Sequence, residues 1–160
     1  MPSLTITRVT RINEKADRVM VNDGMIVLDL MGNVIKQGPK KFDVPRQFTP
    51  AEFNLGKKWT AAFVVNRRGK QSSVHFDVQI ASREKVSVPA GTFDSFKIVA
   101  SGWNETMGAL IEVTLWLVPG VNFPLKTETL TRTRSGQMKV TERHELVALR
   151  QQVFKRLPPQ

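Results

Sequence analysis

The chain has no cysteine, only two histidines and no long hydrophobic run. The absence of cysteine excludes thiol catalysis, cysteine-based zinc fingers and disulfide bridges, but it does not assign a compartment. A chain of 160 residues buries about 70% of its unfolded surface, so it can fold as one domain without a disulfide or a structural metal.

No apolar run reaches the roughly 18 residues of a membrane-spanning helix. The two most apolar segments are interrupted, one by Asp29 and the other by Glu112, and we expect no transmembrane segment. The first residues, MPSLTITRV, contain no apolar signal-peptide core. Either the protein is cytosolic or an export signal has been removed.

Catalytic motifs are also missing: GxSxG, HExxH, GxxxxGK and GxGxxG do not occur. His75 with Asp77, and Glu142 with His144, place imidazole and carboxylate groups two residues apart. Acid–base or metal chemistry would need these pairs to converge with a third group, and exposed strand faces often carry such pairs. We therefore predict that the chain is not an enzyme and has no cofactor and no metal site.

The net charge of +10 favours anionic partners. Lys and Arg are spread along the chain, however, and gather only in short pairs, such as Lys40-Lys41 and Arg67-Arg68. A nucleic-acid track would concentrate them in a stripe. The distribution indicates a generally basic surface.

Short β-branched and aromatic runs between turn residues predict an all-β fold. The turn signals are strongest at Asn22-Asp23-Gly24 and at Arg68-Gly69-Lys70, where positive φ angles suit hairpins. The strands are expected at Leu4 to Ile12 with a bulge near Arg8, and at Arg18 to Val21, Met25 to Leu30, Trp59 to Asn66, Ser73 to Ala81, Phe96 to Trp103, Leu110 to Val118, Leu125 to Arg134 and Gln137 to Leu149.

The segment from Lys36 to Gly56 contains three prolines and no sustained alternation, which predicts a long irregular loop. Within it, Thr49 to Glu52 fits a capping box, so Pro50 to Leu55 is expected to form a short helical turn. We predict an all-β fold with minor α content: a single curved antiparallel sheet or half-open β-barrel, with one short helical turn in a long loop. Residues 1–149 form one domain and residues 150–160 a flexible tail.

Alternation in the strands separates a buried face from a wet face. In the run from Ser73 to Ala81, the residues expected in the core are Val74, Phe76, Val78 and Ile80. The threonine ladder from Thr127 to Thr133, with charged residues on its reverse, indicates an outer or edge strand.

The aromatic residues are the candidates for a binding surface. Trp116 falls on the less apolar face of its strand, in line with Glu112 and Thr114, so it either covers an edge or lines a concave surface. Phenylalanines of the irregular segment either form a lid over that surface or anchor the loop to the core. The candidate ligand-binding residues are Phe48, Phe53, Trp59, Trp103 and Trp116.

Four segments together resemble the TapB-like group of bacterial envelope proteins, most of them of unassigned function. They are DLMGNVIK from Asp29, FNLGKKW from Phe53, VSVPAGTFDSFKI from Val86 and WLVPGVNFPLKTE from Trp116. The resemblance implies a secreted or periplasmic, curved antiparallel sheet and no particular reaction. The chain departs from the pattern at Leu117, where such proteins often have an aromatic residue, and at Asn122 and Pro124.

These observations lead to a first hypothesis of a non-catalytic, periplasmic or secreted domain that binds a lipid or other apolar or amphiphilic ligand, or a partner envelope protein, in the concavity of its sheet. A cytoplasmic location is the alternative. The second hypothesis is a basic β-module that binds single-stranded nucleic acid through stacked aromatic rings and Lys/Arg contacts to phosphates. The third is an enzyme that works through His75 or His144.

Overall fold

The computed structural model describes residues 3–121, 123–133, 135 and 138–149. In this part of the chain, eleven antiparallel strands form one sheet in chain order, not closed into a barrel, with one 3-10 turn, η1 (Asn22–Gly24). This confirms the predicted fold class. The strands are β1 (Val9–Asn13), β2 (Arg18–Val21), β3 (Ile26–Leu28), β4 (Val34–Gln37), β5 (Lys40–Arg46), β6 (Lys58–Arg67), β7 (Lys70–Val88), β8 (Gly91–Asn104), β9 (Ala109–Leu117), β10 (Lys126–Arg132) and β11 (Met138–Glu145).

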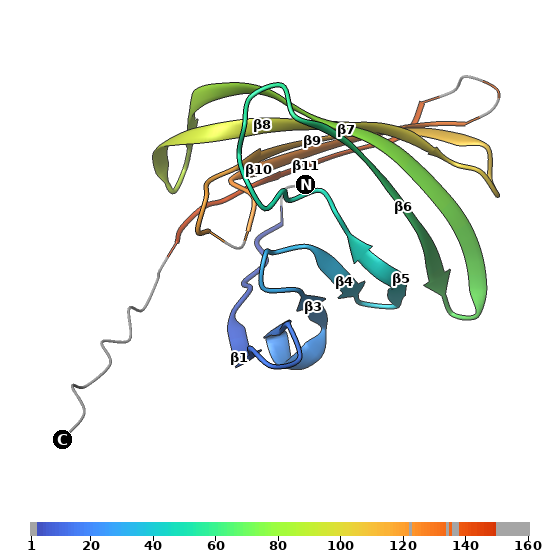
Figure 1. Ribbon diagram of the computed structural model, residues 1–160, viewed down its shortest axis with the longest axis horizontal. Helices are drawn as coiled ribbons and strands as arrows, with labels where there is room; N and C mark the ends of the chain where they lie inside the picture. Colours follow the sequence, from blue (N-terminus) through green and yellow to red (C-terminus); the bar gives the residue numbers. More distant parts are fainter. Residues whose placement is uncertain (1–2, 122, 134, 136–137, 150–160) are drawn as a thin grey trace.

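The long strands β6 to β9 curve into an arch, and the short strands β1 to β5 curl beneath it (Figure 1). Two of the turns between strands lie where the sequence predicted them, at Asn22-Asp23-Gly24 and at Arg68-Gly69. Asn22, Asp23 and Gly24 all have positive φ, as do Arg68 and Gly69 in the two-residue turn between β6 and β7. Asn, Asp and Gly tolerate such angles at little cost, so Asn22 to Gly24 and Gly69 suit these turns, whereas Arg68 adopts a positive φ that its residue type does not favour.

The main core lies between the arch and the segment that joins β5 to β6. The side chains of Val74, Phe76, Val78 and Ile80 in β7 point into this core and are at most 6% exposed, which confirms the predicted buried face. The buried members of this cluster are Phe48, Ala61, Phe63, Val74, Phe76, Val78, Ile80, Ile98, Ala100, Val113, Leu115 and Leu117. A smaller cluster of Val19, Val21 and Leu28 holds β2 and β3 together.

Two predictions for the region from Lys36 to Gly56 were wrong. Strands β4 and β5 occupy much of the segment expected to be irregular, and Pro50 to Leu55 forms bends instead of a helical turn. Thr49 is held by tertiary contacts, because its N–H donates to Asn33 Oδ1 at 2.8 Å and its carbonyl accepts from Asn33 Nδ2 at 3.3 Å. Such anchoring outweighs the weak propensity of one isolated turn.

The strand predicted from Ser73 to Ala81 continues to Val88 as part of β7. Its register with β8 shifts between Ile80 and Ser82, which marks a β-bulge at Ala81. Because the bulge inserts one extra residue, the inward and outward faces exchange beyond it. Arg83 therefore faces the core side, where its guanidinium lies 5.7 Å from the Phe96 ring centroid.

The two ends of the sheet differ in detail from expectation. The first strand begins at Val9 instead of Leu4, and its register shift, between Val9 and Arg11, lies close to the bulge predicted near Arg8. The threonine-bearing strand β10 is outer but not an edge, because β11 pairs along it and forms the edge itself. The predicted tail, residues 150–160, lies outside the described residues, and the domain boundary at 149 stays a prediction.

Arg46 is the last residue of β5 and is half-buried. Its Nε is buried and has no hydrogen-bond partner within the part of the chain that the structure describes. Its guanidinium carbon lies 4.9 Å from the Phe48 ring centroid, so a cation–π contact offsets part of the desolvation cost. Burial lowers the pKa of Arg46 to about 10, which leaves the group charged at neutral pH.

Replacing Arg46 with methionine is expected to raise the free energy of unfolding by about 1 kcal/mol. Removing the unsatisfied buried donor is expected to stabilise the fold by about 1–3 kcal/mol. Losing the cation–π contact is expected to destabilise it by about 0.5–1 kcal/mol. Urea unfolding measures the difference. Arg67→Met, at an exposed position of β6, is the matched control and should change stability little. A less stable Arg46→Met variant would contradict the account.

Candidate functional site: an open groove on the outer face of β7 to β10

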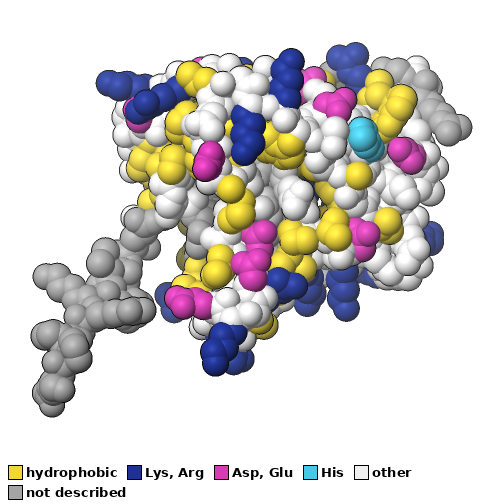
Figure 2. Space-filling model, in the orientation of Figure 1, with side chains coloured by type: hydrophobic (Ala, Val, Ile, Leu, Met, Phe, Trp, Pro, Cys, Tyr) yellow, Lys and Arg dark blue, Asp and Glu magenta, His cyan; other side chains and the backbone are white. Residues whose placement is uncertain are grey.

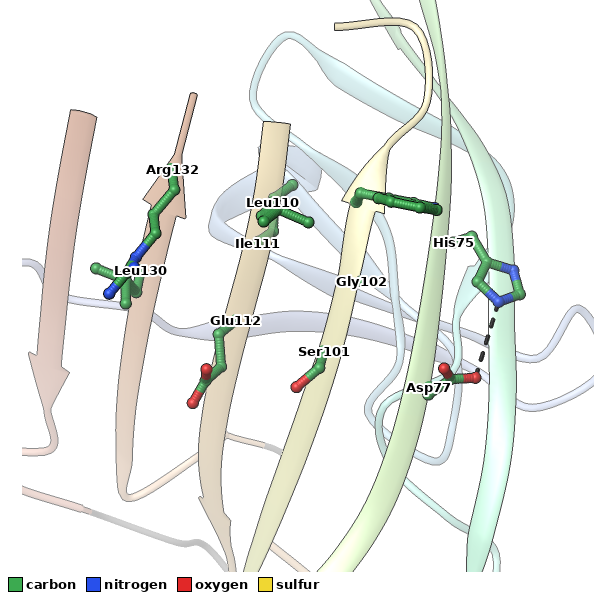
Figure 3. Close-up of a pocket in the computed structure, with 10 residues that line it drawn as sticks. His75, Asp77, Ser101, Gly102, Leu110, Ile111, Glu112, Leu130 and Arg132 are labelled. Atoms are coloured by element: carbon green, nitrogen blue, oxygen red, sulfur yellow. Dashed lines mark ion pairs between the residues drawn. The ribbon is translucent and has the colours of Figure 1, made fainter. Parts of the chain in front are cut away.

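A groove of about 660 Å³ lies on the sheet face opposite the main core. Four neighbouring strands, β7, β8, β9 and β10, supply its lining (Figure 3). The lining residues are His75, Asp77, Ser101, Gly102, Trp103, Leu110, Ile111, Glu112, Leu130 and Arg132.

Cross-strand register arranges eight of these residues in two rows, while Gly102 and Ile111 pair with each other between the rows. His75 pairs with Trp103, which pairs with Leu110, and Leu110 pairs with Arg132. The second row contains Asp77, Ser101, Glu112 and Leu130, each paired with the next. Because directly paired residues share a face of the sheet, the alternation that sends Val78 and Phe76 into the core sends both rows to the outside.

Two large apolar side chains of the first row are open to solvent. Trp103 is 52% exposed and Leu110 is 51% exposed, and they are paired on adjacent strands. A single exposed leucine needs no explanation, but an indole and a leucine side by side in a depression form an apolar floor available to a ligand.

Gly102 allows β7 and β8 to approach each other at the base of the groove. A Cβ built on Gly102 would lie 1.8 Å from the His75 carbonyl oxygen and 2.8 Å from the Phe76 Cα. Both contacts are with backbone, so no side-chain rotation can relieve them. Only glycine fits here, as is typical of tight bends in curved sheets.

The two histidine–carboxylate pairs do not converge. His75 Nε2 lies 3.8 Å from Asp77 Oδ1 on β7, whereas His144 Nε2 lies 3.9 Å from Glu142 Oε2 on β11. Three strands separate β7 from β11, which is about 19 Å across the sheet. Within the described ranges, no three His, Cys, Asp or Glu side chains stand close enough to hold a metal ion.

Three of the predicted ligand-binding residues lie on the core side. Phe48 is buried and packs edge-on against Phe76 at 5.0 Å between ring centroids. Phe53 is half-buried against Phe96, also at 5.0 Å. Trp59 is half-buried and its Nε1 donates to the Gln47 carbonyl at 2.6 Å. These contacts anchor the loop before β6 to the core.

The other two predicted residues share the outer face but lie apart. Trp103 lines the groove, whereas Trp116 is 7% exposed and its Nε1 donates to Glu84 Oε1 at 2.5 Å. Lys126 Nζ and Lys97 Nζ lie 4.9 and 5.8 Å from the Trp116 ring. Trp116 therefore covers the sheet, and only Trp103 of the five predicted residues lines the groove.

Sequence reasoning did not assign Ser101, Gly102, Leu110, Ile111, Glu112, Leu130 or Arg132 to a site. A signal was present, because Leu110 and Leu130 occupy outward-facing strand positions where polar residues are usual. Placing them beside Trp103 requires the pairing register of β8, β9 and β10, which the sequence alone does not fix.

Gly102→Ala is expected to lower the free energy of unfolding by about 3 kcal/mol, because the added methyl group must push β7 away from β8. Gly120→Ala is the matched control: Gly120 has φ +85° and open space around it, so only backbone strain of about 1 kcal/mol applies. Urea unfolding compares the two variants. Equal losses of stability would contradict the close approach at Gly102.

Comparison of the chain with protein-family models, curated proteins and solved structures gave no significant match. No helix among the described residues is long and apolar enough to cross a membrane. The resemblance to the TapB-like group therefore stays a prediction.

Proposed function

We propose that this chain is a non-catalytic binding domain of the cell envelope, and that the groove holds the apolar part of an amphiphilic ligand or of a partner protein. The observation that carries the proposal is the pairing of two half-exposed apolar side chains, Trp103 and Leu110, on the floor of a depression. Their burial by a ligand would release ordered water and contribute binding free energy.

The size of the groove favours a small amphiphile over a protein surface. Its volume of about 660 Å³ falls within the range of about 300–1,000 Å³ typical of small-molecule sites. Its lining combines an apolar floor with a few polar groups, which is the usual composition of such sites. We therefore take the amphiphile as the first ligand to test.

The non-catalytic role and the envelope location have separate supports. The two histidine–carboxylate pairs lie on strands with three other strands between them, a separation that does not suit joint acid–base work. The periplasmic or secreted location is supported by the resemblance of four sequence segments to envelope proteins. Neither point depends on the groove.

The nucleic-acid hypothesis has weaker support. Lys and Arg side chains are scattered over the face drawn in Figure 2, interrupted by acidic and apolar groups, and no continuous stripe crosses it. Single-strand binders combine a basic track with several exposed rings, whereas Trp103 is the only groove tryptophan and has Asp77 and Glu112 near it.

Leu110→Asp is expected to weaken binding of dodecyl maltoside, used below its critical micelle concentration, about tenfold or more. Burial of a leucine contributes about 1.5–3 kcal/mol, and each 1.4 kcal/mol is about tenfold in affinity. Tryptophan fluorescence reports binding because Trp103 is the exposed indole, whereas Trp116 is 7% exposed and Trp59 is half-buried. Native mass spectrometry of protein from its own source would identify a retained ligand.

Leu55→Asp is the matched control, because Leu55 is 62% exposed outside the groove and its replacement should leave affinity unchanged. Equal affinity of the two variants would contradict the proposed site. Retention on immobilised single-stranded nucleic acid at 0.15 M salt, lost steeply at higher salt, would support the nucleic-acid hypothesis instead.

A further inference from the structure

The second row of the groove places two carboxylates on either side of a hydroxyl. Asp77, Ser101 and Glu112 are directly paired across β7, β8 and β9, and their side chains stand side by side on the same face (Figure 3). Neighbouring strands are about 4.8 Å apart. A group bound above Ser101 would therefore lie about 5 Å from the strand that carries each carboxylate.

Neither carboxylate forms an ion pair with a lysine or arginine in the part of the chain that the structure describes, whereas Asp94 and Glu128 do. Asp94 accepts a hydrogen bond from Arg83 at 2.6 Å, which lowers the pKa of Asp94. Glu128 lies 3.3 Å from Lys126 Nζ and 3.7 Å from Arg143 Nε. Over the described ranges, Glu112 has no ion pair, and Asp77 has only His75 at 3.8 Å.

The chain carries ten more basic than acidic groups, and Arg132 is the one basic side chain other than His75 in the groove lining. Among the described residues, no lysine or arginine lies within ion-pair distance of Asp77 or Glu112, so both carboxylates are available to a cationic ligand. The next row places the half-exposed indole of Trp103 diagonally beside them, within reach of a group bound at Ser101. An indole face together with carboxylates is a recognition site for ammonium groups.

We infer that the groove selects amphiphiles that carry an amine or quaternary ammonium group next to the apolar chain. The cation lies between Asp77 and Glu112 above Ser101, and the chain lies along Trp103 and Leu110. This inference rests on the proposed function, since it names the ligand class of the same groove.

Arg132 is compatible with this assignment. It lies on β10, two strands from Ser101 on β8, so about 10 Å separates the backbones of the two strands. At that distance, salt at physiological concentration screens most of the repulsion between exposed charges.

The test uses four amphiphiles with the same twelve-carbon chain, each below its critical micelle concentration: dodecyltrimethylammonium, dodecylphosphocholine, dodecyl maltoside and dodecanoate. Tryptophan fluorescence of the full chain should give the tightest binding for the ammonium compound, followed by the zwitterion, the maltoside and the carboxylate. Asp77→Asn with Glu112→Gln should weaken the ammonium ligand about tenfold, because two exposed charge pairs are lost, and weaken the uncharged maltoside much less.

The control is Glu14→Gln with Asp23→Asn, which removes the same charge at two exposed positions outside the groove and should preserve the order of affinities. If all four amphiphiles bind equally, or dodecanoate binds best, the inference is overturned while the groove remains a binding site. If none binds to the wild-type chain, the proposed function fails as well.

Discussion

Side-chain alternation in the in-register strands β7, β8 and β9 is the constraint on which the rest of the molecule depends. Directly paired residues share a face of the sheet. Val78 pairs with Ala100, which pairs with Val113, and this row lies in the core. The adjacent row of Asp77, Ser101 and Glu112 lies on the outer face. The same strand register therefore determines which residues form the core and which form the groove. A slip of one residue would expose the first set and bury the charges of the second, so the burial of the core also fixes the geometry of the groove.

The sequence predicted those parts of the fold in which local pattern and burial agree. The alternation from Ser73 to Ala81 was read correctly because one face is fully buried, and the turn at Arg68-Gly69 followed from its residue types. The continuation of β7 to Val88 was not predicted, because the bulge at Ala81 reverses the phase of the pattern. Strands β4 and β5 were missed because their residues are half-buried or exposed, so they carry no clear alternation.

The groove was predicted less well than the fold, and the reason is physical. A core residue is identified by its own hydrophobicity, whereas a surface site is identified by its neighbours, which depend on register. Trp103 was correctly singled out as a candidate, but its partners lie on strands up to 29 residues away, as with Arg132. The other predicted aromatic residues stabilise the fold instead of lining the groove. Phe48, for example, packs on Phe76, and Trp116 donates a hydrogen bond to Glu84.

An exposed apolar floor on a sheet is a hazard as well as a site, because it can associate with a second copy of the chain. Carboxylates at Asp77 and Glu112, with Arg132 at the far wall, keep this floor from being a continuous apolar patch, since another apolar surface would have to desolvate them. The close approach of β7 and β8 at Gly102 shapes the sheet at the same point. A ligand that presents a cation to the carboxylates and a chain to Trp103 and Leu110 satisfies both kinds of group together. The residues that interrupt the apolar floor are therefore the ones to which we assign the selectivity for a cationic ligand.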